Sequence, residues 1–181
     1  MKYIKTPIKG LFEIEPQVFG DERGHFFESF KSNEFKETVA DVDFVQDNQS
    51  YSTKGVLRGL HFQNGEFSQG KLVRVITGKI LDVAVDLRPD SPTFGKYHSV
   101  ILDGKKQNML YVPENFAHGF YVIDDAVFTY KCTNYFNKAS ENSLLWNDKE
   151  LAIEWNANSP ILSEKDNQAN TLSQFKMSIG K

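Results

Sequence analysis

The chain has 181 residues, 40% of them hydrophobic and 13% aromatic, which suits one folded domain over residues 1–181 with a core large enough to enclose a ligand. Its net charge is −3 and Lys and Arg form no dense run, which excludes the surface of a protein that grips long nucleic acid. No apolar run is long enough to cross a bilayer and no signal peptide is apparent, so we expect a cytoplasmic protein with no membrane partner.

Helical signals are few along the chain. Ser32 or Asn33 is a suitable N-cap for a short helix that runs through Ala40. From Glu164 onward the apolar spacing is only weakly helical. Helices are therefore expected to be short and peripheral.

Strand signals dominate from Tyr51 to Cys132, where short β-branched and aromatic runs are separated by Gly, Pro, Asn and Asp. The segment from Lys71 to Leu87 predicts a strand over 71–76, a turn near Gly78 and a second strand that pairs with the first. In the second strand, one face is apolar and the other acidic, with Leu81, Val83, Val85 and Leu87 opposite Asp82 and Asp86.

The chain from Leu87 to Pro92 is predicted to be a loop because its prolines cannot continue a central strand. Another strand ends at Pro113, and a loop is expected over 114–119. Two more strands follow, with a turn at Asp124 and Asp125. Many short strands in one domain predict a mainly β fold, a closed barrel with its core at about 45–135 and a ligand in its mouth.

Polar residues are densest in two segments, 46–63 and 114–120. Strict strand alternation puts Arg58 and His61 on opposite faces, so both can line one cavity only if Gly59 forms a bulge that resets the register. An exposed arginine beside a hydrogen-bonded core histidine fits the same residues. Spacing alone leaves both interpretations open.

A metal site finds little support in the sequence. The four histidines include no H-x-H pair, so ligands would have to come from well-separated segments. Cys132 is the only cysteine, which excludes an intrachain disulfide and a thiolate zinc cluster. No glycine-rich phosphate loop and no nucleophile elbow is present. We therefore expect no metal site.

Long motifs cover nearly the whole chain in a characteristic order. They are FGDERGHFFESF, FVQDNQS, GVLRGLHFQ, GKLVRV, DVAVDLRPDSPTFG, VPENFAHGF, YKCTNYF, LLWNDKELAIEW and LSEKD. In combination they resemble the dTDP-4-dehydrorhamnose 3,5-epimerase family. The resemblance implies a cupin-type jelly-roll barrel, a homodimer, and an isomerase that needs no cofactor. It implies epimerisation at C3 and C5 of dTDP-4-dehydro-6-deoxy-D-glucose to dTDP-4-dehydro-β-L-rhamnose, in L-rhamnose biosynthesis.

The resemblance also implies the catalytic residues. His61 would be the base, oriented by Asp166, because a carboxylate can fix the imidazole tautomer and stabilise the imidazolium. Lys71 would stabilise the enolate, and Tyr130 would return a proton on the opposite face of the carbon. Without the resemblance these residues fit a bonded core histidine, a helix cap after Ser163, a solvated strand-end lysine and a core aromatic.

Further residues would hold the substrate. By resemblance they are Arg23, Glu28, Gln46, Asn48, Arg58, His118, Phe136, Glu141 and Lys165. The two arginines suit diphosphate oxygens, and Phe136, where the family often has a second aromatic hydroxyl, can still stack on thymine. In the family an N-terminal strand exchanges between subunits, so Arg23 and Glu28 are expected to serve the partner's pocket.

Three other functions remain as rivals. A single-position epimerase of a related nucleotide sugar would use the same acid and base. A metal-dependent cupin enzyme would require a bound metal, and a non-catalytic sugar-binding module would bind without proton exchange.

Overall fold

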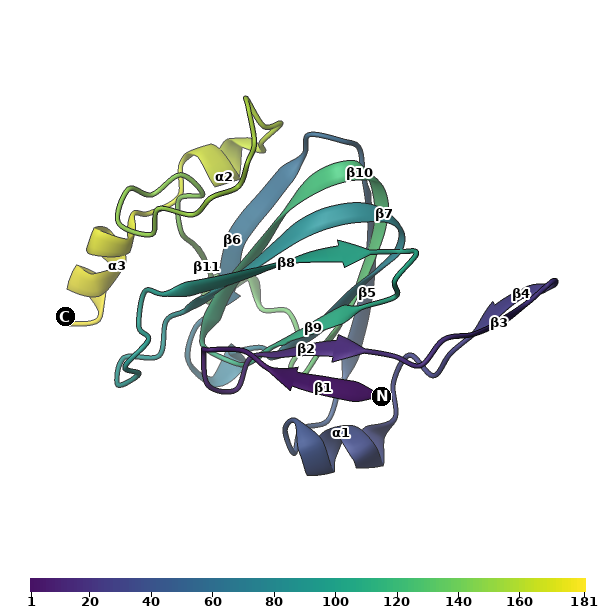
Figure 1. Cartoon of the computed structure of the whole chain (residues 1–181). Coiled ribbons are helices and arrows are strands. Elements are labelled where there is room, and N and C mark those ends of the chain that lie inside the picture. Colours follow the sequence, from purple (N-terminus) through teal and green to yellow (C-terminus); the bar gives the residue numbers. More distant parts are fainter.

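Two long strands organise the computed structural model, which describes residues 1–181. They are β7 (Lys71–Asp86) and β10 (Phe116–Cys132), and they pair antiparallel along almost their whole length (Figure 1). The other strands are β1 (Lys2–Lys5), β2 (Phe12–Glu15), β3 (Phe19–Asp21), β4 (Gly24–Phe26), β5 (Gln46–Ser52), β6 (Leu57–Gln63), β8 (Tyr97–Asp103), β9 (Met109–Val112) and β11 (Glu141–Ser143). Both long strands lie at the centre of the main sheet.

Each long strand changes its outer neighbour partway along. β10 pairs with β6 through its first half and with β5 through its second, while β7 pairs with β9 and then with β8. The β7–β10 register shifts between Val122 and Phe128, where the ladder bends. Strands that pass between two sheets in this way close a barrel. The predicted jelly-roll fold is confirmed.

The two predicted chain reversals inside these strands are wrong. Gly78 lies within β7, and Asp124 and Asp125 lie within β10. These turn signals lie at the place where the two strands bend together. The backbones are close there, because a Cβ on Gly78 would lie 2.7 Å from the Ala126 Cα. The predicted loop over 114–119 is also mostly strand, since β10 begins at Phe116.

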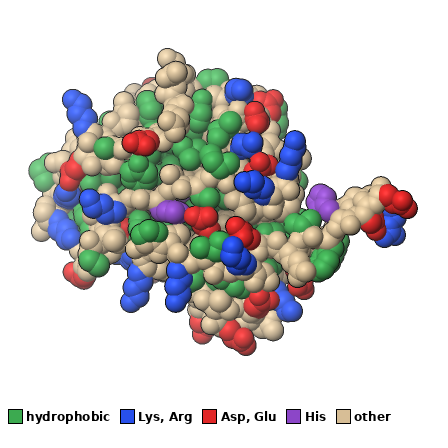
Figure 2. Space-filling model, in the orientation of Figure 1, with side chains coloured by type: hydrophobic (Ala, Val, Ile, Leu, Met, Phe, Trp, Pro, Cys, Tyr) green, Lys and Arg blue, Asp and Glu red, His purple; other side chains and the backbone are tan.

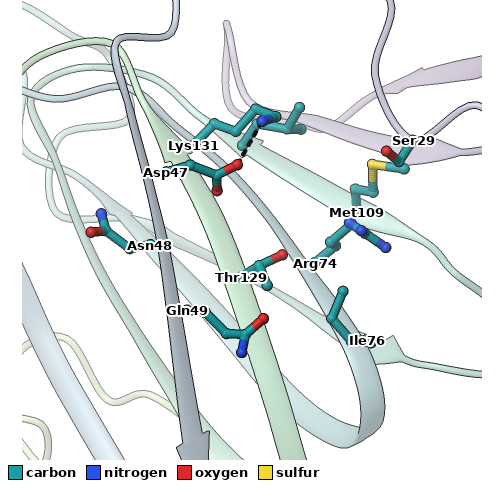
Figure 3. A pocket seen from close by; sticks show the side chains of 10 residues that line it. Ser29, Asp47, Asn48, Gln49, Arg74, Ile76, Met109, Thr129 and Lys131 are labelled. Atoms are coloured by element: carbon teal, nitrogen blue, oxygen red, sulfur yellow. Dashed lines mark hydrogen bonds and ion pairs between the residues drawn. The ribbon is translucent and has the colours of Figure 1, made fainter.

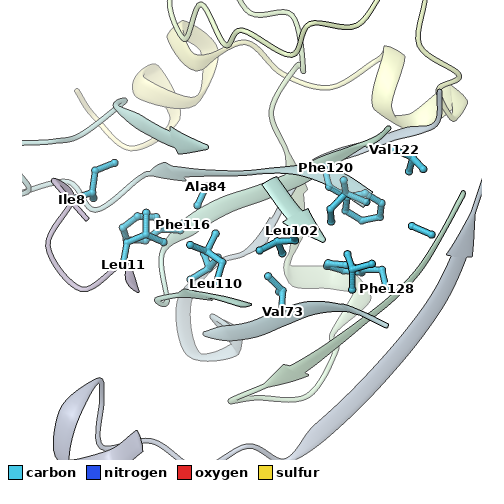
Figure 4. Close-up of a cluster of buried hydrophobic side chains, with 14 residues drawn as sticks. Ile8, Leu11, Val73, Ala84, Leu102, Leu110, Phe116, Phe120, Val122 and Phe128 are labelled. Carbon is cyan, nitrogen blue, oxygen red and sulfur yellow. The ribbon is translucent and has the colours of Figure 1, made fainter. Parts of the chain in front are cut away.

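Apolar side chains fill one part of the barrel interior (Figure 4). Phe120 and Phe128 pack there with ring centroids 4.5 Å apart. Tyr130 lies against the edge of this cluster. The aromatic core therefore borders the polar part of the interior, where a ligand can enter.

A second core covers the outside of the barrel. Leu81, Val83 and Val85 of β7, on the predicted apolar face, pack against Trp155 and Leu172 from the C-terminal segment. The opposite face of β7 is buried too, and Asp82 and Asp86 are both 0% exposed. The C-terminal segment thus anchors the wall that carries the functional side chains.

The helices are short, as expected. They are α1 (Ser32–Thr38), α2 (Glu164–Asn167) and α3 (Leu172–Ser178). The N-cap of α1 is Lys31 and not Ser32 or Asn33, so the predicted cap is wrong. In α2 the Ser163 side chain caps the helix. No helix is long and apolar enough to span a membrane.

β6 carries a bulge at Gly59. His61 pairs with His118 and Arg58 pairs with Phe120, so β6 has one more residue than β10 between these pairs. Gly59 has φ +119°, and a Cβ there would lie 2.6 Å from the Gly119 Cα. The bulge that the sequence analysis required for a shared cavity is present, and it turns Arg58 and His61 toward the same side of β6.

Asp86 holds the loop after β7. Its carboxylate accepts hydrogen bonds from the guanidinium and backbone of Arg88 and from the hydroxyls of Ser91 and Thr93. Burial alone would raise the pKa of Asp86, but these hydrogen bonds outweigh it and lower the pKa from 3.8 to about 2. The ionised form is therefore strongly preferred in the folded state.

This arrangement predicts a stability loss in acid. Because the folded pKa lies below the ordinary value, the stabilisation is present above pH 3.8 and is lost as the pH falls toward about 2. The difference in unfolding free energy between wild type and Asp86→Asn should shrink by about 2 kcal/mol between about pH 6 and about pH 2. Urea unfolding measures it, with the exposed Asp90→Asn as control. A difference that stays constant with pH would contradict this role for Asp86.

Candidate active site

A polar cavity of about 320 Å³ opens between β5, β6, β7 and β10. Its volume suits a sugar ring. The cavity is lined by Gln46, Asn48, His61, Phe62, Gln63, Gln69, Lys71, Tyr130, Phe136 and Glu141. Most residues predicted to bind or transform a substrate therefore line one cavity.

The imidazole of His61 is held by a buried carboxylate. Its Nε2 lies 2.6 Å from Oδ1 of Asp166, and Oδ2 of Asp166 accepts a hydrogen bond of 2.8 Å from the Ser163 hydroxyl. Asp166 is 2% exposed, whereas the His61 side chain is 33% exposed. With the proton on Nε2 donated to the carboxylate, Nδ1 keeps a lone pair that can accept a proton.

Asp166 stays ionised despite its burial. Burial would raise the pKa of Asp166, but hydrogen bonds from His61, Ser163 and the Gly59 backbone outweigh it and lower the pKa. A charged carboxylate in this position favours a protonated imidazole after proton transfer. The Gly59 backbone thus favours the ionised carboxylate, while the bulge sets the register of His61.

Lys71 and Tyr130 supply the other functional groups of the cavity, from β7 and β10. Burial lowers the pKa of Lys71, opposed by the nearby charges of Asp82 and Glu141. Burial raises the pKa of Tyr130, opposed by the positive charge of Arg58. The phenol therefore holds its proton, and the Lys71 side chain lies where it can interact with an anion in the cavity.

His118 does not line the cavity. It is 6% exposed, and its Nε2 lies 2.9 Å from both carboxylate oxygens of Asp82, which is fully buried. The His118 ring also stacks on Phe128. His118 and Asp82 form a buried pair beneath the cavity, and the charge of Asp82 acts on Lys71.

Arg58 and Lys165 do not line the cavity, and each is held by a neighbouring side chain. Arg58 donates a hydrogen bond from Nε to the Ser52 hydroxyl, at 3.0 Å. Lys165 of α2 makes an ion pair of 2.6 Å with Glu141 of β11. Because Asp166 follows Lys165 in α2, this helix contributes to both the Glu141 ion pair and the histidine pair.

Arg23 and Glu28 are far from these groups in sequence and lie on exposed chain. Arg23 belongs to the β3–β4 hairpin, which projects from the body of the molecule (Figures 1 and 2). Its side chain is 85% exposed, and its guanidinium pairs with Asp21 of the same hairpin. Neither residue lines the cavity of its own chain.

Several residues of the site were not predicted. Gln63 lies two positions after His61 on the same strand, so alternation alone could have indicated it. Gln69 precedes β7 and carries no comparable signal. Asp82 looked like part of an acidic strand face, and only the fold brings it to His118.

A second cavity, of about 370 Å³, lies on the opposite face of the same strands (Figure 3). Alternate residues of β7 and β10, including Arg74, Thr129 and Lys131, point into it. It contains an ion pair of 2.7 Å between Lys131 and Asp47 but neither member of the His61–Asp166 pair. No group of three or more His, Cys, Asp or Glu side chains is arranged to hold a metal ion.

Known proteins similar to this chain are epimerases of nucleotide sugars. A chain from Shigella flexneri named dTDP-4-dehydrorhamnose 3,5-epimerase is 53% identical over 168 residues, which cover 92% of this chain and 93% of the relative. The crystal structure of dTDP-6-deoxy-D-glucose-3,5-epimerase from Legionella pneumophila, in complex with dTDP-4-keto-L-rhamnose, matches with a TM-score of 0.94. It is 46% identical, and the match covers 98% of this chain and 96% of that one.

A more distant structure is a 3'-monoepimerase from Streptomyces bikiniensis in complex with dTDP-quinovose. It is 31% identical with a TM-score of 0.90, and the match covers 98% of this chain and 90% of that one. The family model described as dTDP-4-dehydrorhamnose 3,5-epimerase matches residues 5–174. The predicted resemblance is confirmed, and the chain belongs to the dTDP-4-dehydrorhamnose 3,5-epimerase family.

Proposed function

We propose that this chain epimerises dTDP-4-dehydro-6-deoxy-D-glucose at C3 and C5 to dTDP-4-dehydro-β-L-rhamnose, with His61 as the base. The observation that carries the proposal is one cavity lined by both His61, paired with Asp166, and Tyr130. The bound product named for the Legionella relative has the matching chemistry. A metal ion has no step to perform in this scheme.

Proton removal comes first. A hydrogen on a carbon beside the C4 ketone is a weak acid, and Nδ1 of His61 accepts it while Asp166 stabilises the imidazolium. The electron pair moves onto the C4 oxygen, where the ammonium group of Lys71 stabilises the enolate. Lys71 is suited to this role because its side chain lines the same cavity as His61 and Tyr130.

Proton return then sets the stereochemistry. Inversion requires that a proton arrive on the face opposite the one it left, and the hydroxyl of Tyr130 is the donor on that face. Burial favours the protonated phenol, which suits a general acid. His61 then releases its proton to solvent and the Tyr130 phenolate takes one up from solvent. The restored pair acts at the second carbon once the sugar is repositioned.

Substrate contacts surround these groups. Arg58 carries a charge suited to the diphosphate, while Gln46, Asn48 and the Lys165–Glu141 pair suit sugar hydroxyls and the base edge. The ring of Phe136 suits the flat face of thymine. His118 does not contact the substrate in this scheme. It pairs with Asp82, whose charge acts on Lys71.

We further propose a homodimer in which each β3–β4 hairpin reaches the cavity of the partner. Phe19 and Phe26 on the hairpin are 55% and 68% exposed, which is unfavourable for a free surface and suits an interface. In such a dimer Arg23 and Glu28 would complete the partner's site. The protein would then need two chains for full activity.

The base assignment predicts the behaviour of His61→Ala. Proton NMR in heavy water should detect deuterium entering C3 and C5 of the sugar with wild type, and at least about 100-fold less with the variant. Calorimetry should give dTDP affinity within about threefold of wild type, since the base does not hold the nucleotide. His98→Ala, which alters a histidine paired with Glu13 outside the cavity, is the control.

Three results would count against these assignments. Exchange that persists in His61→Ala would remove His61 from the base role. Wild-type turnover at only one carbon would support the single-position epimerase, an activity named for the Streptomyces bikiniensis relative. Tight binding of the dTDP-sugar with no exchange at all would support a binding module.

If the hairpin exchanges between chains, a weakened variant and an inactive variant should restore activity to each other in a mixed dimer. Arg23→Ala should raise KM, and His61→Ala should abolish turnover. A heterodimer made by co-expressing the two contains one cavity with His61 and a partner hairpin with Arg23, so its kcat/KM should recover to about half that of wild type. If Arg23 instead serves its own chain, both cavities of the heterodimer stay defective and activity does not recover.

A further inference from the structure

The loop between β10 and β11 presents an aromatic ring to the cavity without support from the core. We call residues 134–137 the platform loop. Phe136 lines the cavity yet is 56% exposed, and neighbouring Tyr135 is 63% exposed. Side-chain packing therefore fixes these rings weakly. The position of Phe136 depends on what holds the backbone of the loop.

Glutamine side chains hold that backbone. Three glutamines of the cavity wall, from separate parts of the chain, bond to four consecutive residues of the platform loop. Gln69 Nε2 donates to the Asn134 carbonyl at 2.7 Å, Gln63 Nε2 donates to the Tyr135 carbonyl at 3.1 Å, Gln46 Oε1 accepts from the Phe136 amide at 3.0 Å, and Gln63 Oε1 accepts from the Asn137 amide at 2.7 Å.

Both hydrogen-bonding groups of the Gln63 side chain already have partners within the protein. Its side-chain nitrogen also donates to the Phe67 carbonyl at 2.7 Å, so both amide hydrogens and the oxygen are used. Gln63 is 5% exposed, and a buried amide that loses its partners is costly. Although Gln63 lines the cavity, its chemistry is that of a residue that holds the loop.

We propose that Gln63 and Gln69 are positioning residues that order the platform loop, so that the Phe136 ring is in place before the nucleobase arrives. This inference rests on the proposed function, in which Phe136 stacks on the thymine of the substrate. A ring ordered in advance binds a flat base more tightly, because less conformational freedom is lost on binding. The glutamines act on binding and not on proton transfer.

The test uses Gln69→Met, which removes one hydrogen bond and keeps the length of the side chain. The Kd for dTDP and the KM for the dTDP-sugar should rise about fivefold to tenfold, while kcat stays within about twofold. Gln63→Met, which removes three bonds, should have a larger effect of the same kind. Gln174→Met is the control, because it breaks the capping box of α3 away from the cavity and should leave both constants unchanged.

A double-mutant cycle identifies Phe136 as the intermediary. In a Phe136→Ala background, Gln69→Met should no longer change the dTDP Kd, because the ring that it positions is absent. Unchanged binding in Gln69→Met, or an effect that persists at full size without the Phe136 ring, would overturn the inference. Failure of the proposed function would look different, since wild type would then not turn over the sugar.

Discussion

The close approach of two glycine backbones, Gly59 of β6 and Gly119 of β10, is the constraint on which the site depends. A Cβ on Gly59 would lie 2.6 Å from the Gly119 Cα, and one on Gly119 would lie 2.7 Å from the Arg58 carbonyl oxygen. This contact permits the bulge that turns Arg58 and His61 to one side of the strand. Without it, alternation would send the arginine and the base to different surroundings.

The rest of the site is built on that register. Once His61 faces the cavity, α2 can bring Asp166 to its Nε2, and the Ser163 hydroxyl donates a hydrogen bond to the same carboxylate. The long strands β7 and β10 then supply Lys71 and Tyr130 to the same space. In the proposed function these three side chains, from separate strands, act on the sugar from more than one side, which inversion requires.

Sequence patterns predicted the barrel and the apolar face that begins at Leu81, and they indicated where a bulge would be needed, at Gly59. These features follow from strand periodicity and backbone sterics. They failed at Gly78, where a turn signal marks a bend within a strand. Motif resemblance supplied Asp166, since its contact with His61 spans 105 positions and no local pattern encodes it. Neither the sequence patterns nor the family resemblance indicated Gln69, because its partner is a backbone carbonyl, which carries no side-chain signature.

Deuterium exchange into the sugar catalysed by Gly59→Ala, in protein that circular dichroism shows to be folded, tests this account most directly. Gly65→Ala is the matched control, because Gly65 also has positive φ but a Cβ there meets nothing within 4 Å. The account predicts exchange at least about 100-fold slower in Gly59→Ala, since small displacements of a base are costly, and near-wild-type exchange in Gly65→Ala. Folded Gly59→Ala with the wild-type exchange rate would contradict it.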